Sequence, residues 1–185
     1  MKKRMLITIT LICTAIFVFA QEKFYTKSGK ILFSSKAALE NIEAHNKSVT
    51  CVLDAKTGNL QFAVLMKGFE FEKALMQEHF NENYIESHKY PRAEFRGQVI
   101  NISEIDYSKD GIYKALVRGK LSLHGETKDV ETTGTIAVKG GKLEADAEFN
   151  IELADFKVEI PKLVKDNISK TVKVIVDCNL EPLKG

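Results

Sequence analysis

Apolar and polar residues alternate one by one along most of the chain, which is the period of an antiparallel strand with one buried face. In the segment 143–153, acidic residues or an asparagine separate the apolar positions Leu143, Ala145, Ala147, Phe149, Ile151 and Leu153. The same alternation recurs in the segments 113–123 and 172–180. We therefore expect strands that are apolar on one face and solvated on the other.

Short turn sequences separate these strands, and each contains a residue that tolerates a positive φ angle. Examples are Gly58, Gly111 and the pair Gly140-Gly141. The pattern predicts eight strands, with a further short one at Phe24, near residues 30–34, 42–54, 59–66, 92–105, 112–124, 128–139, 142–154 and 170–182. Several are about twice the usual strand length, and closure would remove their exposed edges. The predicted fold class is all-β, a single extended antiparallel eight-stranded barrel.

One segment departs from the period of two. Between residues 70 and 84 the apolar residues follow helical spacing, at Phe71, Leu75, Met76, Phe80 and Tyr84. Pro91 then marks the return to a strand pattern. We expect one amphipathic helix over about 70–84.

The first twenty residues have the layout of a signal peptide. Lys2, Lys3 and Arg4 precede an uncharged stretch over residues 5–20, which is shorter than the ~20 apolar residues of a spanning helix. The prediction is that residues 1–20 are cleaved, that residues 21–185 form one domain, and that this domain is secreted into the periplasm.

Removal of the leader changes the charge of the chain. Three of the 27 basic residues lie in it, so the mature domain has 24 basic against 25 acidic residues. No basic patch of the kind that nucleic acid requires is left. The mature chain keeps Cys51 and Cys178, and an oxidising compartment would permit them to pair, although each also fits its strand as a small free hydrophobe.

The inward face combines large apolar residues with very small ones: Ala93, Gly97, Ala115, Gly119, Gly134, Ala145 and Ala147. An eight-stranded barrel is just wide enough to be filled by side chains or to hold one small ligand, and the composition alone leaves both interpretations open. If a cavity exists, its uncharged lining favours a hydrocarbon chain, since burying a charge there would be costly. On this interpretation, Gly119→Phe should fill part of the cavity.

Signatures of catalysis are missing from the sequence. It contains no nucleophile elbow, phosphate loop, dinucleotide fingerprint or Cys-x-x-Cys pair. The histidines do not have metal-ligand spacing, and they stand at His45, His79, His88 and His124. We therefore expect neither an enzyme nor a metal site, and no cofactor other than a bound lipid.

Several motifs carry a resemblance to a known family. The segment 75–84, together with Tyr90-Pro91 and the run 93–97, strongly resembles the YceI-like family of periplasmic proteins. The strand end 119–125, Gly-Lys-Leu-Ser-Leu-His-Gly, resembles the G-x-L-T-I-H-G pattern of the same family. The resemblance implies a lipocalin-like barrel with a helix near its mouth and a long apolar tunnel that takes up a polyisoprenoid or other amphiphilic lipid.

The leading hypothesis is therefore a non-enzymatic protein that binds, stores or transports such a lipid, as a monomer or homodimer with transient membrane contact. The predicted ligand-binding residues are Phe62, Val64, Met66, Phe69, Phe71, Leu75, Met76, Phe80, Tyr84, Phe95, Val99, Val117, Leu121, His124, Phe149 and Ile151. Among them, His124 and Tyr84 are the candidates for contact with a headgroup. The alternative is a packed structural or stress-related barrel that acts through protein partners on its outer charged face.

Overall fold

A computed structural model describes residues 23–183, so the predicted signal peptide lies outside the described residues. The strands are β1 (Lys23–Lys36), β2 (Asn41–Asp54), β3 (Asn59–Leu65), β4 (Glu70–Phe71), β5 (Arg92–Val99), β6 (Gly111–Leu123), β7 (Glu126–Lys139), β8 (Lys142–Glu152) and β9 (Thr171–Pro182). The helical elements are α1 (Ala74–His79), a π-helical turn η2 (Phe80–Tyr84), and the 3₁₀ turns η1 (Met66–Gly68), η3 (Ile102–Glu104), η4 (Leu153–Phe156) and η5 (Lys162–Val164). Among residues 23–183, no helix is long and apolar enough to span a membrane.

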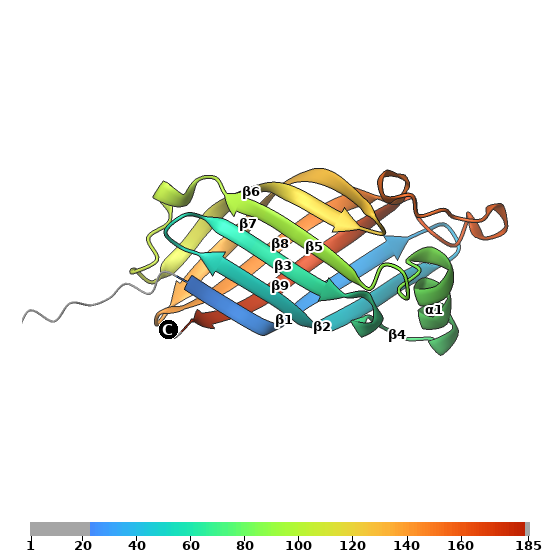
Figure 1. The fold of residues 1–185 in the computed structure, drawn as a ribbon, viewed down its shortest axis with the longest axis horizontal. Coiled ribbons are helices and arrows are strands. Elements are labelled where there is room, and N and C mark those ends of the chain that lie inside the picture. The colour runs from blue at the N-terminus through green and yellow to red at the C-terminus, as the bar shows by residue number, and fades with distance from the viewer. Residues whose placement is uncertain (1–22, 184–185) are drawn as a thin grey trace, which may run out of the picture.

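The long strands close into the predicted antiparallel barrel. Their order is β1-β9-β8-β7-β6-β5-β3-β2, and β2 pairs back with β1, so that eight strands form the wall. The two-residue strand β4 is added beside β2 at Ala44 and His45. Figure 1 shows an elongated barrel with α1 at one end. The end that carries α1, the turn 37–40 and the loop 157–170 is called the mouth end below, and the opposite end is called the closed end.

The bounds of three elements differ from the sequence predictions: the first strand, the strand expected over 92–105, and the helix. The strand expected near 30–34 begins at Lys23 and includes Phe24, because β1 continues through an irregular stretch between Thr26 and Ile31 where its register with β2 shifts. The strand expected over 92–105 ends at Val99.

The early end of β5 has a clear cause. The Asn101 side chain takes over the pairing with β6: its Oδ1 accepts the Leu116 N–H at 2.8 Å, and its Nδ2 donates to the Lys114 carbonyl at 2.9 Å. Because this side chain replaces the backbone of the strand, the chain turns into η3 and leaves the sheet.

The helix predicted over 70–84 is also shorter than expected. Glu70–Phe71 is drawn into β4 by pairing with β2. Residues Phe80–Tyr84 wind more widely than an α-helix, so α1 proper spans Ala74–His79.

Two clusters of buried residues occupy the two ends of the barrel. The closed end is packed by Leu53, Val99, Val138, Leu143 and Leu180 together with their neighbours. Phe24 and Tyr107 stack there with ring centroids 6.2 Å apart. The second cluster, which includes Met66, Phe69 and Phe156, packs under the elements of the mouth end.

Candidate functional site

A cavity of about 400 Å³ runs through the interior of the barrel. Every long strand of the barrel contributes to its wall, from Leu180 and Leu53 near the closed end to Met76, Val164 and Asn167 at the mouth end. Cavities of this size are within the range of small-molecule binding sites. Most side chains that point into the strand-built part are apolar, and the Thr132 hydroxyl is a polar exception. The acidic residues Glu94 and Asp146 also border the cavity, but they alternate with the inward-facing residues of their strands.

The exposure of the inward-facing residues confirms that the interior is not filled by side chains. Phe62, Phe95, Val117 and Phe149 lie on the inner face and line the cavity, yet each is only partly buried. The outer face cannot explain this exposure, because alternate residues of the same strands point outward. The accessible surface of these side chains therefore belongs to the cavity.

Some of the small residues create this space and others do not. Ala93, Ala115, Ala145 and Ala147 line the cavity, which decides the question that composition alone left open. Gly134 lines it too, but a Cβ there would clash with the Asp146 carbonyl oxygen, so this glycine also permits a close backbone approach.

Gly97 and Gly119 instead face each other across β5 and β6. A Cβ on Gly119 would lie 2.5 Å from the Gly97 Cα and 2.6 Å from the Phe95 ring. This pair permits a close backbone approach beneath Phe95, so the expectation that Gly119→Phe fills the cavity is wrong: the added side chain would clash with the sheet.

Four phenylalanine rings close most of the mouth end. Phe33 of β1 contacts Phe69, Phe71 and Phe80, with ring centroids 5.2, 5.6 and 5.4 Å away. Phe80 also contacts Phe71 at 5.0 Å. Tilted and edge-to-face pairs at these separations are favourable. This cluster fixes α1 and η2 on the rim of the barrel.

The structure brings the predicted ligand-binding residues together around the cavity, with two exceptions. Leu75 is 60% exposed, because Met76 of α1 and Phe80 of η2 face the cavity, and Leu75 lies on the solvent side of α1. His124, the second exception, lies behind the cavity wall. Tyr84 does line the cavity, and burial raises the pKa of its phenol.

His124 joins three loops at the mouth end. Its Nδ1 is 2.9 Å from the Phe156 carbonyl, and its Nε2 is 3.0 Å from the Glu86 carboxylate. Since a carbonyl oxygen can only accept, Nδ1 donates to Phe156. The contact with His124 is the main cause that lowers the pKa of Glu86. The Tyr90 ring packs edge-to-face against the imidazole, with centroids 4.8 Å apart.

Backbone conformation supports this structural role. Glu86, His124 and Lys157 have φ angles of 47°, 50° and 54°, and no other non-glycine residue of the described chain has a positive φ. All three stand in the loops that His124 connects. His124 is therefore a positioning residue for the rim, and the predicted contact with a headgroup does not fit its place.

Sequence reasoning missed part of the lining. Phe33 of β1, and Val172, Val174 and Val176 of β9, line the cavity. The apolar phase of the three valines beside Lys173 and Asp177 could have identified them, whereas Phe33 follows Leu32 and shows no such alternation. Val164 and Ile168 also line the cavity, but they lie in a loop without any periodic pattern. No sequence signal would have placed these two at the mouth.

A polar cluster stands at the rim. Glu40 of the turn 37–40 accepts a hydrogen bond from Lys73 at 2.9 Å and one from Asn167 at 3.4 Å. The bond from Lys73 is the main cause that lowers the pKa of Glu40. Together with His79 and Tyr84, Glu40 and Asn167 give the mouth the polar groups that the deeper cavity lacks.

The two cysteines are neighbours across β1. Both are buried free thiols, and a hydrogen bond with Cys178, followed by burial, raises the pKa of Cys51. Gly29 of β1 makes room for them, since a Cβ there would lie 2.6 Å from the Cys178 Sγ.

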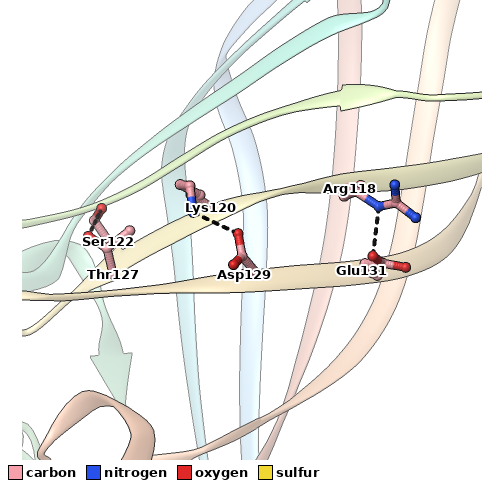
Figure 2. A network of polar contacts seen from close by, with 6 residues as sticks. All are labelled: Arg118, Lys120, Ser122, Thr127, Asp129 and Glu131. Atoms are coloured by element: carbon pink, nitrogen blue, oxygen red, sulfur yellow. Dashed lines mark hydrogen bonds and ion pairs between the residues drawn. The ribbon is translucent and has the colours of Figure 1, made fainter.

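The outer face carries paired polar groups. Figure 2 shows one row of them across β6 and β7, where Arg118 meets Glu131 at 2.6 Å and Lys120 meets Asp129 at 2.8 Å. All four side chains are largely exposed, so these pairs contribute little to stability. Within residues 23–183, no cluster of three or more His, Cys, Asp or Glu side chains could hold a metal ion.

Fold and cavity together define a class, that of lipocalin-like antiparallel barrels with an apolar interior that opens at one end. Residues 22–180 match the YceI-like domain family. The chain belongs to that family, and the resemblance noted in the sequence is confirmed.

Solved structures with the same fold include three from bacteria. A polyisoprenoid-binding domain from Saccharophagus degradans has a TM-score of 0.76 at 14% identity, covering 88% of this chain and 99% of that one. BcnA from Burkholderia cenocepacia has a TM-score of 0.66 at 21% identity, covering 82% and 94%. The YceI protein of Campylobacter jejuni has a TM-score of 0.54 at 13% identity and full coverage of both chains. No curated protein matches the sequence.

Proposed function

We propose that this protein binds the apolar chain of a polyisoprenoid or another long amphiphilic lipid in its cavity, and that it stores or carries that lipid in the periplasm. The observation that carries the proposal is the unfilled interior of about 400 Å³, whose strand-built wall presents mostly apolar side chains. A hydrocarbon chain would gain roughly 0.8 kcal/mol for each methylene group moved there from water.

The electrostatics of the wall favour a neutral chain over a charged ligand. Glu94 alternates with the inward-facing Ala93 and Phe95, and its carboxylate pairs with Arg96 at 3.1 Å on the outer face. A charged group inside the strand-built part would have no counterion, and its burial would be costly. The same lack of an ionisable group at depth supports binding over catalysis.

Two further observations support the choice of ligand and compartment. The Saccharophagus degradans domain of the same fold binds polyisoprenoid. The signal peptide expected at residues 1–20 would deliver the domain to a compartment that adjoins a membrane, which is the reservoir of such lipids.

The test is to purify the protein from its native compartment, extract it with organic solvent and identify the extracted molecules by mass spectrometry. An unrelated exported protein from the same cells, purified identically, is the control for carried-over lipid. We expect a stoichiometric long-chain lipid. An empty barrel that also fails to bind a fluorescent polyprenyl probe after delipidation would overturn the proposal.

A further inference from the structure

Three leucine side chains project into solvent from the rim of the barrel. Leu39 in the turn 37–40 is 73% exposed, Leu75 in α1 is 60% exposed, and Leu163 in η5 is 95% exposed. Isolated surface leucines are common and need no explanation. These three, however, lie on three different elements of the mouth end, and hydrogen bonds connect those elements to one another.

Direct contacts hold the three elements together. The Leu39 N–H donates to the Asp166 carbonyl at 3.0 Å, which places the turn 37–40 against the loop 157–170. Glu40 accepts from Lys73 just before α1 and from Asn167 in the same loop. Figure 1 shows these elements gathered at the mouth end. The three leucines therefore belong to one rim surface.

The rim surface surrounds the opening of the cavity. Each of its elements also supplies a residue of the cavity wall: Glu40 from the turn, Met76 from α1, and Val164 from η5. A chain that leaves the cavity at this end therefore passes between the elements that carry the exposed leucines.

The loop side of the rim is basic. The loop 157–170 contains four lysines and two acidic residues, and Lys36 adjoins it at the end of β1. Lys162 and Lys165 are exposed, and neither takes part in an ion pair among residues 23–183. On the helix side the rim is acidic, at Glu72, Glu78 and Glu82. Glu40 of the turn 37–40 is paired with Lys73.

We propose that the rim surface docks on a lipid bilayer that contains anionic headgroups. Leu39, Leu75 and Leu163 enter the apolar boundary of the bilayer, and the lysines of the loop 157–170 lie at its negatively charged surface. This inference rests on the proposed function, since docking in this orientation lets a chain move between bilayer and cavity without crossing water.

The test measures co-flotation of the delipidated protein with vesicles that contain phosphatidylglycerol, and with vesicles of phosphatidylcholine alone. We expect tighter binding to the first kind. The double variant Leu39→Ser with Leu163→Ser should lower the partition coefficient at least tenfold for each leucine removed. The double variant Lys162→Gln with Lys165→Gln should lower it by roughly fivefold for each lysine, and only on the anionic vesicles.

Matched controls come from the closed end. Ile112 is 76% exposed at the start of β6, so Ile112→Ser removes a comparable apolar side chain far from the rim. Lys109→Gln with Lys114→Gln removes the same charge as the lysine variant. Both controls should bind vesicles like the unmodified protein.

The two proposals fail in different ways. Rim variants that float with vesicles as well as the unmodified protein would overturn the docking surface, even if the barrel still binds a fluorescent polyprenyl probe in solution. Loss of probe binding by the unmodified protein would overturn the proposed function instead. Rim variants that keep probe binding in solution but lose flotation and slow the transfer of the probe between vesicles would support both.

Discussion

Filling the cavity from its wall is the most direct test of whether a lipid chain occupies it. Ala147 of β8 lines the cavity and is only partly buried. Its partner on β7, Gly134, has no side chain. The change Ala147→Phe therefore adds a ring to unfilled space, in contrast to a position in the packed core, where overpacking costs about 1–3 kcal/mol.

The expected loss of affinity follows from the length of chain that the ring displaces. If the phenyl group excludes about three methylene groups, binding weakens by about 2.4 kcal/mol, which is roughly fiftyfold. This loss should depend on the ligand, because a chain too short to reach Ala147 from the mouth meets no obstacle.

The assay is calorimetric titration of the delipidated protein with saturated fatty acids of increasing length. In the unmodified protein, affinity should rise with each added methylene until the chain reaches the closed end. In the Ala147→Phe variant, the rise should stop about three methylenes earlier, with the affinity for short chains unchanged.

The matched control is Asn150→Phe, which adds the same ring to the exposed outer face of β8. It should leave the length profile unchanged, and circular dichroism should show the same β spectrum for all three proteins. Identical length profiles for the unmodified protein and Ala147→Phe would refute the placement of the chain in this cavity.

Three further predictions concern the frame around the cavity. The contact with His124 lowers the pKa of Glu86, so this contact should stabilise the fold above the ordinary carboxyl pKa of 4.5, and the stabilisation should be lost as the pH falls through the pKa of Glu86 in the folded protein. The Tm difference between the unmodified protein and Glu86→Gln should therefore shrink over that acidic range. A Tm difference that does not depend on pH would contradict this prediction. Gly29→Ala should destabilise the fold by about 1–3 kcal/mol, since its methyl group would meet the Cys178 Sγ; denaturant unfolding should show that Cys178→Ala partly relieves this cost, and additive effects of the two changes would argue against the contact. Reversal of an outer charge by Asp129→Lys should cost less than about 1 kcal/mol and leave lipid binding unchanged, whereas lost binding would favour a barrel that acts through its outer face.

The strands that form the barrel wall could be predicted from the sequence because each strand is marked by its own local pattern of residues. A period of two marks each long strand, and the observed β2, β6, β7 and β9 agree with the predicted ranges to within about two residues. The end of β5 could not be predicted, because it depends on Asn101 reaching the backbone of β6. That contact exists only once the strands are paired.

The roles of the small inward residues could not be predicted from the sequence either, because they also depend on contacts between strands. Ala147 and Gly119 look equivalent in the sequence, since each is a small residue in phase with an apolar face. Each also stands opposite a glycine, Gly97 for Gly119 and Gly134 for Ala147, but their roles differ because a Cβ on Gly119 would lie 2.6 Å from the Phe95 ring. The position of neighbouring side chains such as the Phe95 ring, which is set only once the strands are paired, decides whether a small residue borders open space, and the sequence pattern does not contain it.

The difference between the two ends of the barrel sets the orientation of any ligand. Tightly packed apolar side chains, with Phe24 stacked on Tyr107, occupy the closed end. Glu40, His79 and Asn167 gather at the mouth. A polar headgroup placed at the closed end would lose its hydration without gaining hydrogen bonds, which is costly, whereas at the mouth it meets water and these polar side chains. We therefore expect the proposed amphiphile to enter with its apolar end first and to keep its headgroup at the rim, next to the surface that we propose docks on the bilayer.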